Sequence, residues 1–232
     1  MVHQVTRFSD AYAAWENWNL TSFEIRSEYV LGFKQALQGV EPALAAVIDY
    51  HYQHSAQLLS KTHEMPGPTG ETNELYTAGR GVALIIQDHV SQSAQQVAIA
   101  QLTCALLAGN SVIVCSDDID LIKALETTAK SASLPINLLQ FASLDAYHQL
   151  LESDVRSVGY IGNQEVERNI NRQLAKRTGA IVGLVSETDV ELIPVAHDPH
   201  LSLRFITERT RTINITAVGG NATLLELGSE TH

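Results

Sequence analysis

Two cysteines could act as thiol nucleophiles, but neither has a setting that activates a thiol. Cys104 lies in the apolar run QLTCALLAG, which is typical of a small buried thiol. Cys115 ends a predicted strand and is expected to be partly exposed. It has no basic neighbour to stabilise a thiolate, and Asp117 and Asp118 would raise its pKa. We therefore predict no catalytic cysteine. Two cysteines make no disulfide framework, which favours a reducing, cytoplasmic location.

Histidines supply the other candidate chemistry. His51 and His54 are three residues apart on a predicted helix, a spacing that can bind a metal only with further ligands, so a solvated helix face is the simpler interpretation. His197, Asp198 and His200 occupy a predicted loop, and the same reasoning applies. The motifs G-x-S-x-G, H-E-x-x-H and the P-loop do not occur. The sequence predicts no metal site and no catalytic constellation.

Charge and hydropathy exclude two classes of partner. The formal net charge of −11, without a basic stripe, argues against a nucleic-acid surface. Apolar runs such as GVALII and SVIVC are too short to span a bilayer, and the N-terminus lacks the pattern of a signal peptide.

The N-terminal third of the chain is expected to be helical, because apolar residues recur there at helical spacing. We predict a helix capped by Ser9 or Asp10 that runs through Trp18, and a capping box of Thr21 and Glu24 for the next helix. The segment MPGPTGETN, from Met65 to Asn73, has the composition of a loop. The second and third predicted helices cover 25–37 and 42–60.

Short apolar strands alternate with helices after Gly81. This alternation predicts an α/β fold with a Rossmann-like, open, mostly parallel sheet and helices on both faces. The expected strands are 82–86, 111–115, 134–141, 158–161 and 180–185, and the expected helices are 91–107, 119–131, 144–151 and 164–176.

Ligands of such sheets bind at the carboxyl ends of the strands, with phosphates at helix N-termini. The corresponding segments here are 87–91, 115–118 and 162–163, and none carries a G-x-G-x-x-G fingerprint. Asp117 and Asp118 would repel a phosphate. A sheet without a bound dinucleotide is the favoured interpretation.

The tail predicts an antiparallel β-flap. Residues 203–206 and 211–218 alternate polar and apolar positions, which places Ile213, Ile215 and Ala217 on one face, and 222–227 can form a further strand. A two-stranded ribbon is marginal alone and needs a surface to lie on. We expect a helical and Rossmann-like domain at 1–201 and a flap at 202–232.

These segments resemble a known family. The order of GRGVALIIQ, LLAGNSVIVCSDD and VGYIGNQEVERNI is similar to the NAD-binding half of the aldehyde dehydrogenase superfamily, from Ala11 to Val185. The tail ERTRTINITAVGGNATLLELG, with MPGPTGETN and GAIVGLVSE, resembles the C-terminal domain of the proline utilization A enzymes, which oxidise proline to glutamate through pyrroline-5-carboxylate.

The resemblance implies a catalytically silent relative. Only 186–202 joins the sheet to the tail, where the family inserts the domain that carries its nucleophile. Cys115 occupies the position at which the family has a lysine that reaches the adenosine ribose. The family also has a Thr-Gly-Ser turn near the pyrophosphate; this chain keeps only its glycine, Gly162, and has Asn163 in place of the serine. Glu187 is the nearest match to the acid/base glutamate. Cys115, Gly162 and Asn163 are thus vestigial cofactor positions, and no bound NAD is expected.

The family's terminal ribbon is an oligomerisation flap that covers the active site of a neighbour. The resemblance implies docking on an aldehyde dehydrogenase module of a proline-oxidising enzyme, or on a second copy, with enclosure of the intermediate. The alternatives are an NAD-dependent 1-pyrroline-5-carboxylate dehydrogenase and a dinucleotide-sensing module. The expected interaction residues are Arg211, Ile213, Ile215, Ala217, Gly219, Gly220, Asn221 and Leu224.

Overall fold

The computed structural model describes residues 2–67 and 70–214. The chain divides into two compact units: the first comprises 1–60 and 78–207, and the second comprises 61–77 and 208–232. The expected flap therefore shares its unit with a segment from the first third of the chain. No helix among the described residues is long and apolar enough to cross a membrane.

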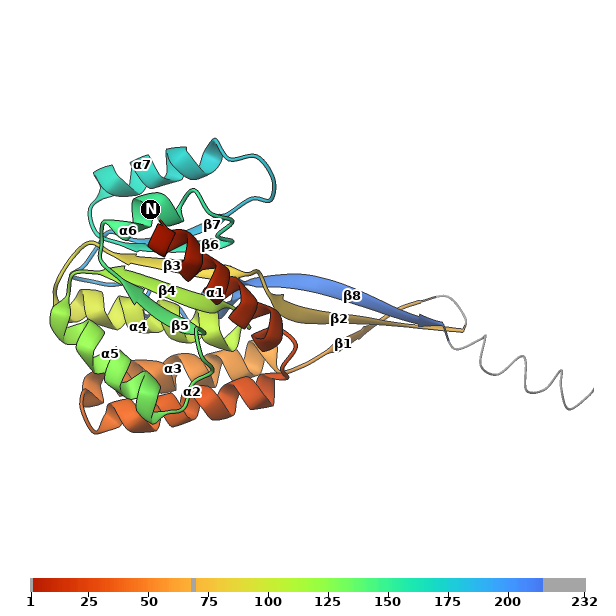
Figure 1. Cartoon of the computed structure of the whole chain (residues 1–232). Coiled ribbons are helices and arrows are strands. Elements are labelled where there is room, and N and C mark those ends of the chain that lie inside the picture. The colour runs from red at the N-terminus through yellow and green to blue at the C-terminus, as the bar shows by residue number, and fades with distance from the viewer. Residues whose placement is uncertain (1, 68–69, 215–232) are drawn as a thin grey trace, which may run out of the picture. The chain divides into compact units, whose positions relative to one another are not determined.

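A five-stranded parallel sheet forms the centre of the first unit, in the order β5-β4-β3-β6-β7 (Figure 1). This is the strand order of a doubly wound fold, and its direction of winding reverses between β3 and β6. The predicted α/β fold class is confirmed. The strands are β3 (Val82–Gln87), β4 (Ser111–Ser116), β5 (Leu139–Ala142), β6 (Ser157–Ile161) and β7 (Gly183–Glu187).

Helices cover both faces of this sheet, and each layer has its own apolar core (Figure 1). Four helices build the larger core on one face, and three pack on the other face. The larger layer contains α2 (Phe23–Gln38), α3 (Pro42–Leu59), α4 (Gln92–Leu107) and α5 (Ile119–Ser131), and the smaller contains α1 (Val2–Trp18), α6 (Ala146–Leu150) and α7 (Gln164–Ala175).

Several helices and strands begin at other residues than the sequence predicted. Helix α1 begins at Val2, before the predicted caps at Ser9 and Asp10. The N-cap of α2 is Ser22, whose hydroxyl accepts from the Ile25 N–H at 3.4 Å, and not Thr21, whose hydroxyl donates to the Trp18 carbonyl. Strands β5 and β7 begin later than predicted, at 139 and 183. Local hydrogen bonds of a turn or a cap determine where a helix or strand begins. The periodicity of apolar residues gives no information on these hydrogen bonds.

The second unit contains a three-stranded antiparallel sheet in the order β1-β2-β8. Its strands are β1 (His63–Met65), β2 (Glu71–Gly79) and β8 (Ile206–Asn214). The prediction of a loop across 65–73 was wrong at both of its ends, which belong to strands. The predicted strand 203–206 was also wrong, because Leu201–Phe205 is a 3-10 turn that leads into β8. Ile215, Ala217, Gly219, Gly220, Asn221, Leu224 and the predicted strand 222–227 lie outside the described residues.

Candidate functional site

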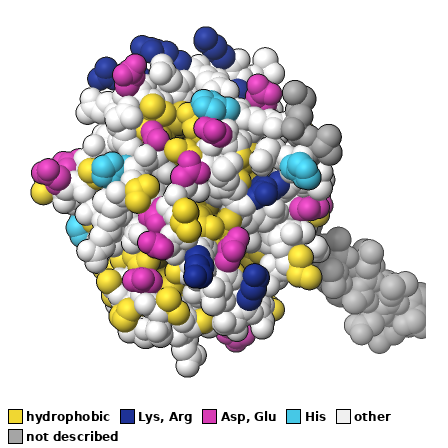
Figure 2. Space-filling model, turned by 60° about the vertical axis from the view of Figure 1, so that its left-hand side comes forward, with side chains coloured by type: hydrophobic (Ala, Val, Ile, Leu, Met, Phe, Trp, Pro, Cys, Tyr) yellow, Lys and Arg dark blue, Asp and Glu magenta, His cyan; other side chains and the backbone are white. Residues whose placement is uncertain are grey.

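The carboxyl edge of the parallel sheet is the place where a ligand of this fold would bind. Figure 2 turns this side of the molecule forward, and Asp and Glu side chains lie across it among hydrophobic ones. The polar residues that follow the strands come from four separate connections. They are Gln87 and Asp88 at the end of β3, Ser116, Asp117 and Asp118 at the end of β4, Gly162 and Asn163 after β6, and Glu187 at the end of β7.

A buried hydrogen-bond network occupies the edge above β3 and β4. Ser116 Oγ donates to Gln87 Oε1 at 3.0 Å and accepts from the Asp118 N–H at the same distance. Asp118 Oδ1 caps α5 by accepting from the Leu121 N–H at 3.1 Å. Its Oδ2 accepts from the amides of Gln95 at 2.9 Å and Gln87 at 3.4 Å. The side-chain amides of Gln87 and Gln95 are therefore bound to the chain's own Asp118 carboxylate.

The buried side chain of Tyr160 on β6 reaches the end of β3, at the point where the sheet's winding reverses. Tyr160 Oη donates to Asp88 Oδ2 at 2.9 Å, and burial together with the neighbouring Asp88 carboxylate raises the pKa of Tyr160. A Cβ added at Gly162 would lie 2.4 Å from Tyr160 Oη and 3.1 Å from Asp88 Cβ. The absence of a side chain at Gly162 thus makes room for Tyr160.

The three residues predicted as vestigial cofactor positions have structural roles in this arrangement. Cys115 is fully buried in the smaller core, so its predicted partial exposure was wrong. Gly162 accommodates Tyr160, as described above. Asn163 Oδ1 accepts from the N–H groups of Glu165 and Val166, at 3.1 and 3.0 Å, and so uses the amides at the start of α7 that could hold a phosphate. With carboxylates at both neighbouring loops, these residues do not fit a dinucleotide pyrophosphate.

Neither thiol is placed for nucleophilic attack. Burial raises the pKa of Cys104 far above its ordinary value. Burial also raises the pKa of Cys115 to about 12, with a smaller upward effect of Asp117 and an opposing effect of Arg7. A thiolate is the reactive form of cysteine, so burial of both side chains disfavours their reactive form.

Glu187, the nearest match to an acid/base glutamate, is buried and fixed to the backbone. Its Oε1 accepts from the Asp189 N–H at 2.9 Å, and its Oε2 accepts from the Val195 N–H at 2.8 Å. Both carboxylate oxygens therefore hold the loop that follows β7. This geometry gives the residue a structural role.

The sequence suggested that His51 and His54 share one solvated helix face, but His51 is buried. His51 is 1% exposed, and its Nε2 lies 3.0 Å from the Ala196 carbonyl, which can only accept, so the neutral ring carries its proton on Nε2. His200 Nδ1 lies 3.8 Å from Asp198 at the surface. Among the described residues, no group of three His, Cys, Asp or Glu side chains is arranged to hold a metal ion.

The described interaction residues lie on β8 in the second unit. Arg211 Nε donates to Glu74 Oε2 at 2.9 Å, and its guanidinium lies 6.0 Å from the centre of the Tyr76 ring on β2. Thr212 Oγ1 donates to Asn73 Oδ1 at 2.6 Å. Ile213 is 43% exposed. Sequence reasoning missed β2 as the partner strand, because the segment NELYT does not alternate polar and apolar residues.

Comparison with curated proteins identifies homologues. No protein-family model matches the chain. It is 28% identical over 166 residues to the bifunctional protein PutA of Salmonella typhimurium, which covers 71% of this chain and 11% of PutA. It is 29% identical over 202 residues to the bifunctional protein PutA of Rhizobium meliloti, which covers 86% of this chain and 15% of PutA. The chain spans only a small part of the length of these relatives.

Solved structures agree with this similarity. A mutant proline utilization A of Bradyrhizobium japonicum matches with a TM-score of 0.68 and 26% identity, over 80% of this chain and 22% of that chain. A 1-pyrroline-5-carboxylate dehydrogenase from Thermus, solved with bound NAD, shares the fold with a TM-score of 0.66 at 17% identity, over 81% of this chain and 42% of that chain. This chain is therefore a homologue of part of the PutA proteins and has the fold that they share with aldehyde dehydrogenases.

Proposed function

We propose that this chain is a non-catalytic aldehyde-dehydrogenase-like domain that docks through its terminal β-flap. The partner is a 1-pyrroline-5-carboxylate dehydrogenase module of a proline-oxidising enzyme, or a second copy, and docking helps to enclose the intermediate. Homology to part of PutA supports the connection with proline oxidation.

The observation that carries the proposal is that the described residues of the second unit form no buried core. None of its described residues, 61–67, 70–77 and 208–214, is buried, and β8 is exposed throughout 208–214. A small sheet without a buried face gains little from folding alone, because apolar burial is the main favourable contribution. Covering such a sheet with a partner surface would supply that burial.

The direction of the side chains on β8 supports an apolar contact. Arg211 and Ile213 lie on the same side of the strand, because side chains alternate along it. The Arg211 guanidinium is already paired with Glu74 and positioned over Tyr76. Ile213 is exposed and apolar, so it is the described side chain best suited to bury itself against a partner.

In this proposal the partner catalyses the reaction, and this domain does not. The glutamine side-chain amides at the carboxyl edge are bound by Asp118, the thiols are buried, and Glu187 holds a loop. No group in this set is free to act as a nucleophile or base towards an aldehyde. We propose accordingly that the domain functions without NAD.

The proposal can be tested with a bifunctional proline-oxidising enzyme that keeps its proline dehydrogenase and 1-pyrroline-5-carboxylate dehydrogenase modules but lacks this domain. We expect the full chain to bind this enzyme in sedimentation velocity and to shorten the lag before NADH appears from proline. Ile213→Asp is expected to weaken binding at least tenfold, whereas Thr210→Asp, on the opposite side of β8, should change it less. Equal binding of wild type, Ile213→Asp and a chain ending at Thr207 would refute docking through the flap.

A dehydrogenase or dinucleotide sensor is the alternative, favoured by the fold shared with an NAD-bound dehydrogenase. Both alternatives require a dinucleotide site, whereas the docking domain does not. Calorimetric titration of the chain with NAD separates them. Micromolar binding that is lost in Asn163→Asp would establish a cofactor site and replace the proposal of a domain without NAD.

A further inference from the structure

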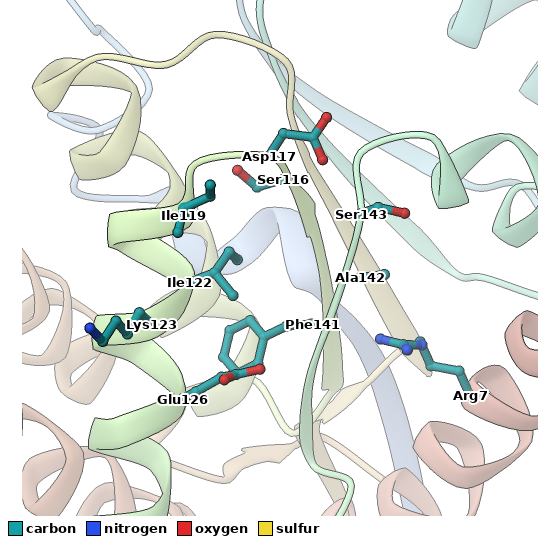
Figure 3. A pocket seen from close by; sticks show the side chains of 10 residues that line it. All are labelled: Arg7, Ser116, Asp117, Ile119, Ile122, Lys123, Glu126, Phe141, Ala142 and Ser143. Carbon is teal, nitrogen blue, oxygen red and sulfur yellow. The ribbon is translucent and has the colours of Figure 1, made fainter.

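A groove runs along the outer edge of the parallel sheet, between α5 and β5. It consists of two cavities of about 600 and 370 Å³ that share Glu126 and Phe141. Figure 3 shows the larger cavity, in which the Phe141 ring lies between Ile122 and Glu126, and Arg7 approaches from the side opposite α5. Both cavities belong to the first unit, and neither involves the flap.

The backbone at this edge is available for pairing. Among the described strands β5 pairs with β4 alone. The Val112 N–H donates to the Leu138 carbonyl, and backbone groups alternate along a strand, so the N–H and C=O groups of Leu139 and Phe141 face outward. At the opposite edge, by contrast, the Arg204 guanidinium reaches the Leu184 carbonyl of β7 at 3.4 Å.

The strand lacks the usual protection of an open edge. Edge strands commonly carry charged residues, proline or bulges that prevent association. The four residues of β5 are Leu, Gln, Phe and Ala. Two exposed isoleucines lie at the two ends of the groove, Ile119 beside the carboxyl end of β5 and Ile136 beside its amino end, with exposures of 78% and 86%.

The face of α5 that lines the groove complements itself. Its residues recur at helical spacing, with Ile119, Ile122, Lys123 and Glu126 in one cavity and Glu126, Ala129 and Lys130 in the other. Within the described part of the chain, Lys123 and Glu126 form no ion pair. When such a helix lies antiparallel to a copy of itself, Lys123 faces Glu126 of the second copy, and the reverse pair forms by symmetry.

We propose that this edge is a homodimer interface, in which β5 pairs antiparallel with β5 of a second copy. The two five-stranded sheets then join into one continuous sheet, and the α5 helices lie side by side on one face. A two-fold axis is the simplest symmetry for such a contact, since each copy presents the same surface. Ile119 of one copy then packs near Ile136 of the other, and the Phe141 and Leu139 side chains meet across the strands.

The test is the oligomeric state, measured by sedimentation velocity from about 1 to about 100 µM. Both the full chain and a chain ending at Thr207 are measured, so that a dimer formed by the flap is distinguished from a dimer formed by β5. We expect both to dimerise. Leu139→Pro removes an outward N–H without removing a bond to β4, so it should leave the circular dichroism spectrum unchanged and give a monomer.

A charge exchange tests the arrangement of α5 independently of strand pairing. Lys123→Glu and Glu126→Lys should each weaken the dimer about tenfold, because like charges then face each other, and the double variant should restore it. Lys176→Glu, at the C-cap of α7, is the matched control and should have no effect. A chain ending at Thr207 that stays monomeric, or a double variant as weak as the single ones, would overturn the proposal.

Discussion

At the residue scale, His51 shows how burial fixes the state of an ionisable group. Its ring is enclosed by α3 and the loop that carries Ala196, with His54, His197 and Asp198 as the nearby titratable groups. Burial lowers the pKa of His51 to about 4, against the opposing hydrogen bond to the Ala196 carbonyl. The folded protein therefore keeps this ring neutral at a pH where an unfolded chain protonates it.

Stability should consequently decrease in mildly acidic solution. Well above pH 6.5 His51 is neutral in both states and has no effect on the pH dependence. Between pH 6.5 and about 4 the unfolded state binds the additional proton, and the free energy of unfolding falls by up to about 3 kcal/mol. Urea unfolding of wild type and His51→Gln across this range measures the difference. The exposed His148→Gln variant should retain the wild-type slope, and an unchanged slope in His51→Gln would contradict the assignment.

Gly162 offers a second prediction at this scale. Gly162→Ala places a methyl group against Tyr160 and disturbs its bond to Asp88, so we expect the free energy of unfolding to fall by about 1–3 kcal/mol. Gly32→Ala is the matched control: a Cβ there meets nothing within 4 Å, and alanine favours a helix, so it should stabilise by up to about 1 kcal/mol. Equal unfolding midpoints in urea for the two variants would show that the space beside Gly162 is not closely packed.

At the element scale, the sequence predicted the parallel sheet well because burial on both faces leaves a simple pattern. Residues 82–87 and 111–116 are buried without interruption, and a continuous apolar run is the expected signature of such strands. The apolar run of β4 did not predict that Cys115 is buried, because such a run gives no information on which helix covers the end of the strand. Helix α1 provides that cover, and it begins seven residues before the predicted Ser9 cap.

The strands of the second unit could not be predicted in the same way. Strand β1 and most of β2 have no buried face, so their residues lack the apolar alternation of a core strand, and the two prolines nearby favoured a loop. The polar network of the carboxyl edge was hidden for another reason. Gln87, Gln95 and Asp118 lie on three elements, and only the packing of those elements shows that they saturate one another.

At the scale of the whole molecule, the two units differ in how much apolar surface their described residues bury. The first unit contains both apolar cores, whereas the described residues of the second unit are all at least partly exposed. Apolar burial dominates folding free energy, so the first unit is expected to fold alone and the second to depend on a bound surface.

A truncation tests this division directly. We expect a chain ending at Thr207 to unfold in one cooperative transition with a midpoint within about 3 °C of the full chain, since residues 208–214 are all exposed. Addition of the dehydrogenase module should raise the midpoint of the full chain and leave that of the truncated chain unchanged, because only a ligand of the folded state stabilises it. Differential scanning calorimetry measures both effects. Loss of cooperativity on truncation would instead make the flap part of the folding unit, and its exposed face would then have to be explained without a partner.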